Sequence, residues 1–553
     1  MFPHLVIGEI RNNKSSFNEL NELKFQCDLS SRHLKSRNML PLRHFVLLAF
    51  IVGIRTSLSY HVLFYHNWGT KSHLIQFAPV MEELLGRGHE VTAVIYNSIK
   101  VKNENYTEIL VPNAGDRVTN EVSQVLMSQN RWNFTMWMSL YEQGKQSLED
   151  IAVQPLRDDK FKAFLKSEKK VDLIVAVMGT GAFLADHFNC PIALFSPIGP
   201  MGLNVPGTGI DINLSVQPSV TGGFIEPMTF FERIGNHIKF RGEMWFLEWL
   251  LNLLAGYQRE EWNSGPIRDP LVIMRERFSI LISASHPVTH GSWPYPPNII
   301  ECGSLHLKDP QPLPSDLKNF MDSSKRGVVF VSFGSAIKPS QMPKERMLVF
   351  LEAFRNIDLS VIWKWDSEIP NLPQNVMISP WVPQQDLLAH PKLKVFVTHG
   401  GMGSIMESIY HKATIVGIPL ANDQRANLLR AANHGYARML DWASLTAEDL
   451  SDAINEGAKD DEMTSAVERI HDLYVDSMQR PVELAAWWLE YVCRHEGAGI
   501  LQHSAGDGVP WYQWHHVDIA IFIIGIASFI CGTIVLSCVI CFKKCFKKKI
   551  KTE

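Results

Sequence analysis

A histidine followed by two glycines, at the end of a short apolar run, is the clearest chemical feature of the sequence. Residues 395–398 are typical of a buried strand, and His399, Gly400 and Gly401 lead from them into a stretch of helical character. A strand that turns into a helix leaves backbone N–H groups at the positive helix end, where a diphosphate can bind. Glycine lets the backbone approach the phosphates closely. The pattern predicts a diphosphate site.

Residues on either side of this turn could hold a nucleoside attached to the diphosphate. Trp381 offers an aromatic face for a nucleobase, and Gln384 can hydrogen-bond the edge of the base. A loop with Ser332, Gly334 and Ser335 follows an earlier strand and would close over the diphosphate.

The stretch from Trp381 to Gln424 resembles the signature of the UDP-glycosyltransferase family, which includes UDP-glucuronosyltransferases and arthropod UDP-glucosyltransferases. The resemblance extends through residues 87–91, 327–335 and 487–495 and covers nearly all of the chain after Tyr60. It implies a UDP-sugar as co-substrate, two Rossmann-like domains that face each other across a cleft (the GT-B type), and a small lipophilic acceptor.

The resemblance also implies roles for single residues. His399 and Ser404 would contact the phosphates, and Glu407 would accept hydrogen bonds from both ribose hydroxyls. Asp423 and Gln424 match the pair that holds the hydroxyls of the sugar.

Sugar transfer with inversion needs a base that takes the acceptor proton, and His73 matches the position of the base in the family. An imidazole suits this role because its ordinary pKa is near the working pH. The family usually orients the base with an acidic residue, and that position is Val177 here. Asp172 and Asp186 lie nearby in the sequence, but the sequence alone assigns neither as a substitute.

Two further features bear on the donor. No Asp-x-Asp metal motif occurs in the chain, so a metal-independent reaction without a cofactor is expected. Ser283 stands where glucuronosyltransferases carry an arginine suited to the carboxylate of the donor. A neutral hexose such as glucose is therefore expected rather than glucuronate.

Three functions stay open at this point. The first is an inverting hexosyltransferase that acts on a small lipophilic hydroxyl compound. The second is a UDP-sugar-binding regulatory partner of related transferases in a homo- or hetero-oligomer, and Val177 is the feature that favours it. The third is a membrane-lipid glycosyltransferase, which the same membrane anchor would suit.

Periodicity and β-propensity predict an α/β protein with two doubly wound sheets. The expected strands of the first half are 61–65, 90–96, 171–177 and 191–195, with a helix at 74–85; those of the second half are 327–333, 361–365, 376–379, 395–398 and 414–418. The expected organisation is an N-terminal acceptor domain at 60–293, a proline-rich linker at 294–326, a UDP-sugar domain at 327–480, and a return helix and stalk at 481–518.

Two apolar segments predict the membrane topology. Residues 1–59 would contain an extension and a signal peptide around 45–54, with Met39 as the natural start. Residues 519–542 carry no charge and are long enough for a transmembrane helix, and the lysine-rich tail at 543–553 would be cytosolic. The globular part would then be lumenal, as a single-pass type I protein of the endoplasmic reticulum.

Several smaller features agree with this topology. Lys549 and Lys551 resemble a dilysine retrieval signal, and Asn105, Asn133 and Asn213 begin glycosylation sequons.

The net charge of −4 gives no case for a nucleic-acid partner. Residues 230–257 are rich in aromatic residues and leucine with interspersed charges, so they could lie on the membrane surface or form an ordinary packing helix.

Overall fold

The computed structural model describes residues 59–67, 71–111, 147–200, 202–262, 265–335, 338–502, 509–514 and 516–549 of the chain. All elements below belong to one unit, Tyr60–Glu553. The expected signal peptide, the start at Met39, the sequon Asn133 and Lys551 lie outside the described residues.

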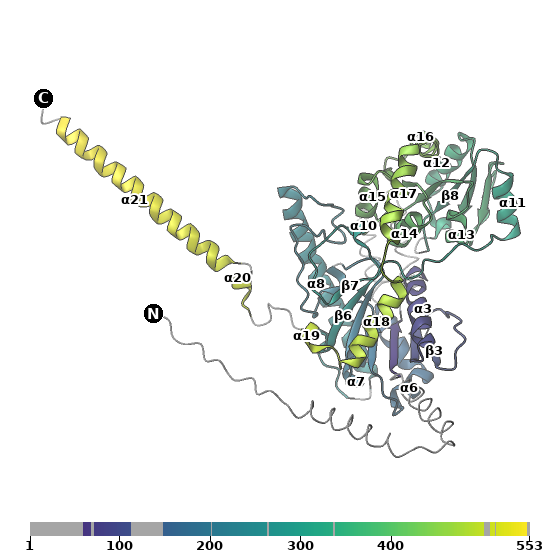
Figure 1. Cartoon of the computed structure of the whole chain (residues 1–553), viewed down its shortest axis with the longest axis horizontal. Coiled ribbons are helices and arrows are strands. Elements are labelled where there is room, and N and C mark those ends of the chain that lie inside the picture. Colours follow the sequence, from purple (N-terminus) through teal and green to yellow (C-terminus); the bar gives the residue numbers. More distant parts are fainter. Residues whose placement is uncertain are drawn as a thin grey trace, which may run out of the picture. The chain divides into compact units, whose positions relative to one another are not determined.

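The first sheet contains seven parallel strands in the order β3-β2-β1-β4-β5-β6-β7 (Figure 1). Helices cover both faces of this sheet, so its strands carry apolar side chains on both sides. Their sequences are therefore continuous apolar runs. The strands are β1 (His61–His66), β2 (Glu90–Ile95), β3 (Tyr106–Leu110), β4 (Leu173–Ala176), β5 (Ile192–Ser196), β6 (Phe278–Ser283) and β7 (Ile299–Glu301).

Helices on both faces of this sheet form its two apolar cores. On one face, α3 contributes Leu74, Phe77 and Leu84 to the core. Residues from α6, α7 and α9 fill the other face. The helical elements of this half are α3 (Lys71–Gly86), a helix at 147–157, α6 (Asp159–Lys166), α7 (Ala182–His187), η1 (Gly202–Asn204), α8 (Phe230–Glu261), α9 (Pro270–Arg277) and α10 (Pro287–His290).

The second sheet contains six parallel strands in the order β10-β9-β8-β11-β12-β13. The strands are β8 (Val328–Ser332), β9 (Ser360–Lys364), β10 (Val376–Ser379), β11 (Leu393–Thr398), β12 (Ile415–Gly417) and β13 (Ala437–Met439). The helical elements around it are α11 (Ser315–Ser323), η2 (Pro339–Gln341), α12 (Lys344–Arg355), α13 (Gln384–Leu388), α14 (Met402–Tyr410), α15 (Gln424–Asn433), α16 (Ala447–Gly457) and α17 (Asp461–Val475).

The α/β class, the doubly wound sheets and every strand expected from the sequence are confirmed. The sequence reading did not include β3, β6, β7 and β13. Three of them are edge or next-to-edge strands of three to five residues that include polar side chains, so they carry a weak β signal.

The segment 294–326, expected to be a proline-rich linker, contains two regular elements, β7 and α11. Strand β7 completes the first sheet by pairing with β6. Helix α11 buries Leu317 and Met321 in the core of the second sheet. The prolines flank these elements instead of interrupting them, so the connection between the domains is much shorter than 294–326.

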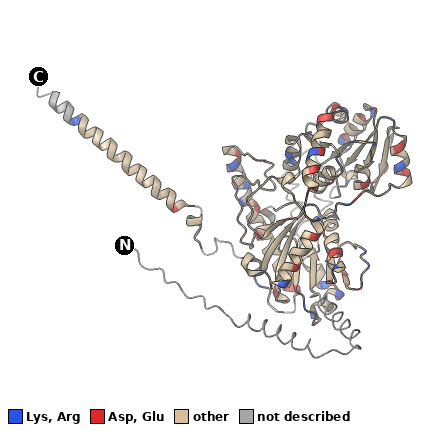
Figure 2. Ribbon diagram, in the orientation of Figure 1, with Lys and Arg blue, Asp and Glu red and all other residues tan. Residues whose placement is uncertain are grey.

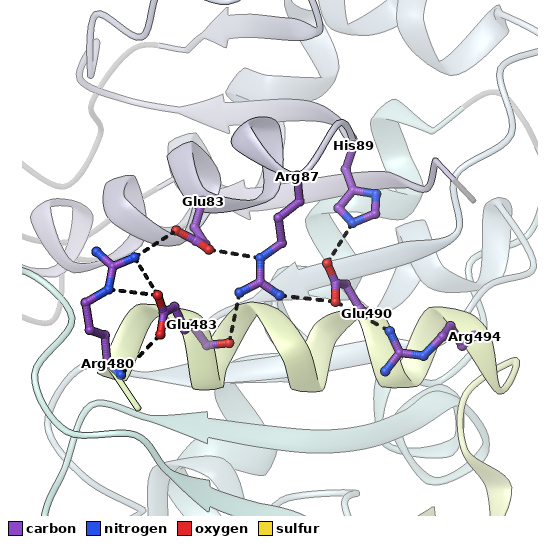
Figure 3. Close-up of polar contacts among 7 residues, drawn as sticks. All are labelled: Glu83, Arg87, His89, Arg480, Glu483, Glu490 and Arg494. Atoms are coloured by element: carbon purple, nitrogen blue, oxygen red, sulfur yellow. Dashed lines mark hydrogen bonds and ion pairs between the residues drawn. The ribbon is translucent and has the colours of Figure 1, made fainter. Parts of the chain in front are cut away.

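After the second sheet the chain returns to the first domain through α18 (Pro481–Arg494) (Figure 1). Ala485 and Leu489 join the same core as α3. Figure 3 shows the polar contacts around this packing: the guanidinium of Arg87 donates to Glu490 Oε2 at 3.2 Å, and Glu490 Oε1 lies 2.9 Å from His89 Nε2. Two stretches of the family resemblance, 87–91 and 487–495, therefore meet here and hold the return helix in place.

The chain continues through α19 (Gly499–Gln502) and α20 (Trp511–Trp514) into α21 (Val517–Lys549). Within the described residues, Val517–Lys543 is the one helix long and apolar enough to cross a membrane, with a mean hydropathy of 2.7. Figure 2 shows it without charged residues between an acidic start and a basic end. The expected span 519–542 lies inside this helix.

Candidate functional site

The predicted diphosphate turn lies where two central strands end together. Thr398 at the end of β11 pairs with Ser332 at the end of β8, so the loops after both strands meet at one edge of the sheet. Gly401 is the N-cap residue of α14, whose free N–H groups point to the same edge. The ends of these two parallel strands bring together the two loops expected around a diphosphate.

The glycines of this edge surround the ring of His399. A Cβ on Gly334 or Gly401 would lie only 2.8 or 2.7 Å from a ring atom of His399. Gly400 has a positive φ of 81°, and a Cβ there would lie 2.4 Å from the side chain of Leu428. These three positions therefore require glycine for packing, in addition to any approach of phosphate. Ser335, at the outer end of the loop, is exposed.

The imidazole of His399 is buried and electrically neutral near pH 7. Burial and the nearby ammonium of Lys364 lower the pKa of His399 to about 4. Its Nδ1 lies 3.3 Å from the hydroxyl of Thr398. A neutral imidazole in this position can donate one N–H to a phosphate oxygen without adding a full charge.

Lys364 is a member of this site that sequence reasoning missed. It ends β9, its Nζ donates to the carbonyl of Gly334 at 2.8 Å, and it lies 5.7 Å from the ring centroid of Trp381. Burial, and repulsion from Lys71, lower its pKa. The sequence did offer one signal for it, because Lys364 lies between two tryptophans near the end of an expected strand.

Glu407 collects the polar side chains around the position expected for the ribose. Its carboxylate accepts hydrogen bonds from Gln384 and, at 2.9 Å, from His306 Nε2. The amide of Gln384 also lies 3.3 Å from the hydroxyl of Ser404. Three residues that the sequence placed in one site are thus in direct contact.

His306 is the second residue that sequence reasoning missed. It comes from the segment expected to be a linker, and only 7% of its side chain is exposed. Its Nδ1 lies 3.0 Å from the hydroxyl of Ser304. Because an ionised carboxylate only accepts hydrogen bonds, Nε2 of His306 carries the proton toward Glu407. A lone histidine among prolines gave no signal for this contact.

Asp423 and Gln424, expected to hold the sugar, are both buried beside the same turn. Asn427 donates to Asp423 Oδ2 at 2.7 Å and to the carbonyl of Gly400 at 3.1 Å. Burial raises the pKa of Asp423. The side-chain oxygen of Gln424 accepts from the backbone N–H groups of residues 420 and 421, which fixes the loop before α15.

Trp381 faces the first domain and is 55% exposed. The Nζ of Lys71, the first residue of α3, lies 4.3 Å from its ring centroid, a cation–π distance. His73 stands two residues further along the same helix. The start of α3 therefore forms the wall opposite the predicted base-stacking face.

His73 is half-buried and lies beside the buried His66. Its ring centroid is 6.3 Å from that of His66, and burial lowers the pKa of His73 to about 4. Among the described residues, burial is the one cause of this shift, so no carboxylate there supports the imidazolium form. Val177 is buried in the same apolar core as α3.

The two aspartates that the sequence could not assign as partners of His73 form other polar contacts. Asp172 precedes β4 at the amino end of the sheet, where it accepts from the backbone N–H of His61 at 2.9 Å and pairs with Lys170 at 2.6 Å. His73 follows the carboxyl end of β1, at the opposite edge. Asp186 forms a two-point hydrogen bond with Arg268. Neither aspartate is placed to orient His73.

The protein family described as "UDP-glucoronosyl and UDP-glucosyl transferase" matches residues 67–552 of the chain. The chain belongs to this family. A UDP-glycosyltransferase, UGT5, from Dactylopius coccus is 29% identical over 492 residues, which are 85% of this chain and 90% of the relative. Human UDP-glucuronosyltransferase 2B15 is 30% identical over 512 residues, 88% of this chain and 94% of the relative.

Solved structures agree with the fold. The glycosyltransferase of kitacinnamycin superimposes with a TM-score of 0.53 at 19% identity, covering 78% of this chain and 99% of that chain. The spinosyn forosaminyltransferase SpnP gives a TM-score of 0.52 at 16% identity, covering 79% and 99%. The two parallel sheets of this UDP-glycosyltransferase family member are thus those of GT-B glycosyltransferases.

Ser283 lies apart from the donor residues of this family member. It is fully buried at the end of β6, and its hydroxyl lies 2.8 Å from that of Ser285, which donates to Glu301 at 2.7 Å. No contact among the described residues joins it to the site around Glu407. Its bearing on sugar choice stays a prediction from the sequence.

Proposed function

We propose that this family member transfers a hexose from a UDP-sugar, with inversion and without a metal, to a hydroxyl of a small lipophilic acceptor. The observation that carries the proposal is the cluster at Glu407, where Gln384 and His306 hold the carboxylate beside the His399–Gly401 turn. Such pre-organised polar groups at the ends of parallel strands are typical of nucleotide sites.

In this proposal each part of the donor meets a group of suitable chemistry. Uracil stacks on Trp381 after the ammonium of Lys71 moves aside, and the ribose hydroxyls donate to Glu407. The N–H groups at the start of α14 and the cation of Lys364 stabilise the negative charge that develops on the departing UDP. Asp423 and Gln424 orient the hexose.

On the opposite wall, His73 takes the proton of the acceptor hydroxyl as its oxygen attacks the anomeric carbon. A histidine with a pKa of about 4 is neutral at pH 7, so it can accept this proton. The resulting imidazolium is poorly stabilised, because burial disfavours its charge and Val177 supplies no carboxylate. Transfer by this chain is therefore expected to be slow relative to a family member with the acidic partner.

For the sugar we propose glucose over glucuronate. The supporting features are Ser283, in place of the arginine of glucuronosyltransferases, and a Dactylopius coccus relative named UDP-glucosyltransferase 2, 29% identical over 461 residues. A Ser283→Arg variant is a poor test because the site is fully buried. Direct comparison of the two UDP-sugars is the better one.

The deciding experiment measures donor binding and turnover separately. Full-length protein in detergent is titrated with UDP by calorimetry, then incubated with UDP-glucose or UDP-glucuronate and a panel of phenols, sterols and ceramide. Product that is lost in His73→Ala supports the transferase. UDP binding without product from any acceptor supports instead the regulatory UDP-sugar-binding partner, which the valine at 177 favours, and product from ceramide alone supports the membrane-lipid transferase.

We also propose that the globular part is lumenal in the endoplasmic reticulum, with α21 as the anchor. The sequons at Asn105 and Asn213 support this, since both side chains are exposed. If the proposal holds, endoglycosidase H lowers the apparent mass of the protein from cells, and Asn105→Gln or Asn213→Gln removes one step of that shift. Absence of any shift in the wild type contradicts the lumenal placement.

A further inference from the structure

Helix α8 carries two separate apolar faces. One face includes Phe240, Met244 and Leu247, which are buried against the loop at 205–214. At 100° per residue, a second apolar stripe is centred about 130° away around the helix axis. Its members are large and exposed: Phe230, Phe231, Ile234, Ile238 and Trp245.

The large apolar side chains of the second stripe are exposed over most of their surface. Phe231 is 80% exposed, Trp245 71% and Ile238 67%. Single apolar residues on a surface are common, but a contiguous row of large ones marks a surface that binds something. The stripe spans about four helical turns, from residue 230 to 245.

Basic side chains lie along one edge of this stripe. Arg233, His237 and Arg241 are exposed and fall within about 80° of one another around the helix axis. An apolar face bordered by cationic and imidazole groups is the pattern of helices that lie in the interface of a bilayer, where phosphate groups are found beside acyl chains.

A contact just before the anchor helix α21 lies close to α8. Trp514, three residues before α21 begins, donates its indole N–H to Asp211 Oδ2 at 2.6 Å. The next residue along, Ile212, packs against Phe240, Met244 and Leu247 on the buried face of α8. The chain therefore enters its apolar anchor helix from a point joined to the loop that supports α8.

We propose that the stripe Phe230–Trp245 of α8 docks on the phospholipid bilayer that α21 spans, with its aromatic side chains at the boundary of headgroups and acyl chains. The docking needs only α8 and the anchor. Where the proposed function also holds, the docked helix keeps the acceptor domain against the bilayer, in which lipophilic acceptors dissolve.

The test places a fluorescent, environment-sensitive amino acid at position 231 or 238 of the full chain reconstituted in phosphatidylcholine vesicles. A matched control carries it at Leu348, an apolar residue of α12 that is 49% exposed. Doxyl-labelled phosphatidylcholine is then added as a quencher. We expect a blue shift and loss of emission at 231 and 238, and neither at 348.

A second variant separates docking from other occupants of the stripe. Ile238→Glu with Trp245→Glu should abolish quenching at position 231 while the chain stays in the vesicles through α21 and still binds UDP. Quenching at 231 and 238 that does not exceed that at 348 overturns the proposal. So does a blue shift that grows with protein concentration without doxyl quenching, because it identifies a second copy as the occupant. None of these readouts uses sugar transfer, so failure of the proposed function is seen separately.

Discussion

At the scale of single residues, Glu407 joins Gln384 and His306 in the proposed donor site. Its carboxylate accepts hydrogen bonds from His306 and Gln384, which fix its orientation. Pre-organisation of this kind lowers the cost of binding. In the proposed function this carboxylate binds the ribose, and His306 holds the carboxylate in position.

Replacement of Glu407 by Ala is expected to weaken UDP binding by a factor of about 10 to 100, because hydrogen bonds to charged groups contribute about 1.5–3 kcal/mol. His306→Leu should weaken UDP binding in the same direction but less, and the double variant should lose less than the sum of both. Calorimetric titration with UDP measures all three, with Glu352→Ala at an exposed position of α12 as control. Unchanged affinity in Glu407→Ala contradicts the ribose assignment.

Val177 is the other residue on which the proposed function depends, since it leaves His73 without the acidic partner that the family usually supplies. Val177→Asp should raise the pKa of His73 above about 4, because a nearby negative charge favours the imidazolium. The acid limb of the pH–rate profile should then move to higher pH. The rate should rise by about 10- to 100-fold, part of the ~10⁴-fold that such a carboxylate supplies in serine-protease triads.

Val177→Asn is the matched control for this gain, since it has the shape of aspartate without the charge. Initial rates with UDP-glucose between pH 4 and 8 decide the matter. Equal profiles for the Asp and Asn variants would show that position 177 does not act on His73 through charge.

At the scale of elements, the sequence predicted what local patterns determine. The apolar runs at β1, β4 and β8 and at residues 395–398 of β11 are buried on both faces, so these strands could be predicted without tertiary information. Strand β7 has three residues among prolines, and only its pairing with β6 makes it a strand. Pairing between strands that are distant in the sequence cannot be inferred from local sequence patterns.

The donor site followed the same division. Gln384, Ser404 and Glu407, which a family signature assigned to one site together with Trp381, are in contact, whereas their roles toward a donor stay predictions. His306, in the segment after β7, and Lys364, the last residue of β9, are distant from these residues in the sequence, and only the fold brings them there. The same is true of the contacts that exclude Asp172 and Asp186 as partners of His73.

The return helix α18 permits a prediction at this scale. Glu490 accepts hydrogen bonds from Arg87, His89 and Arg494, and its side chain is only 13% exposed. Glu490→Ala leaves the first two donors without their acceptor, so a loss of about 1–3 kcal/mol in stability is expected. Glu490→Gln, which keeps one acceptor oxygen, should lose less.

Thermal unfolding in detergent measures this loss, with Glu260→Ala at the exposed end of α8 as control. A midpoint for Glu490→Ala equal to that of the control would mean that α18 is held by its apolar face alone.

At the scale of the whole molecule, the two sheets depend on each other through chain path and contact. The chain leaves the first domain, builds the second, and returns by α18 to the core of the first. Arg430 of α15 forms a two-point hydrogen bond with Glu226 of the first domain, and its guanidinium lies 5.3 Å from the ring centroid of Trp293. Unfolding of one domain should therefore destabilise the other.

Buried histidines link this stability to pH. Burial lowers the pKa of His66 to about 3 and that of His290 and His399 to about 4. In the unfolded chain each imidazole has a pKa near 6.5, so the unfolded state binds more protons between pH 6.5 and 4. Stability therefore rises with pH in that window. It is fully present above pH 6.5 and is lost as the pH falls below it, by a few kcal/mol per histidine at most.

His66 offers the sharpest test of this linkage, because neither ring nitrogen has a hydrogen-bond partner among the described residues and its ring stacks on Phe77. His66→Phe keeps the shape and removes the titration. The thermal midpoint of the variant should be close to that of the wild type at pH 7.5 and higher than it at pH 5, whereas His495→Phe, at an exposed site, should change neither. If the difference in thermal midpoint between His66→Phe and the wild type does not grow as the pH falls, protonation of buried His66 does not contribute to acid unfolding.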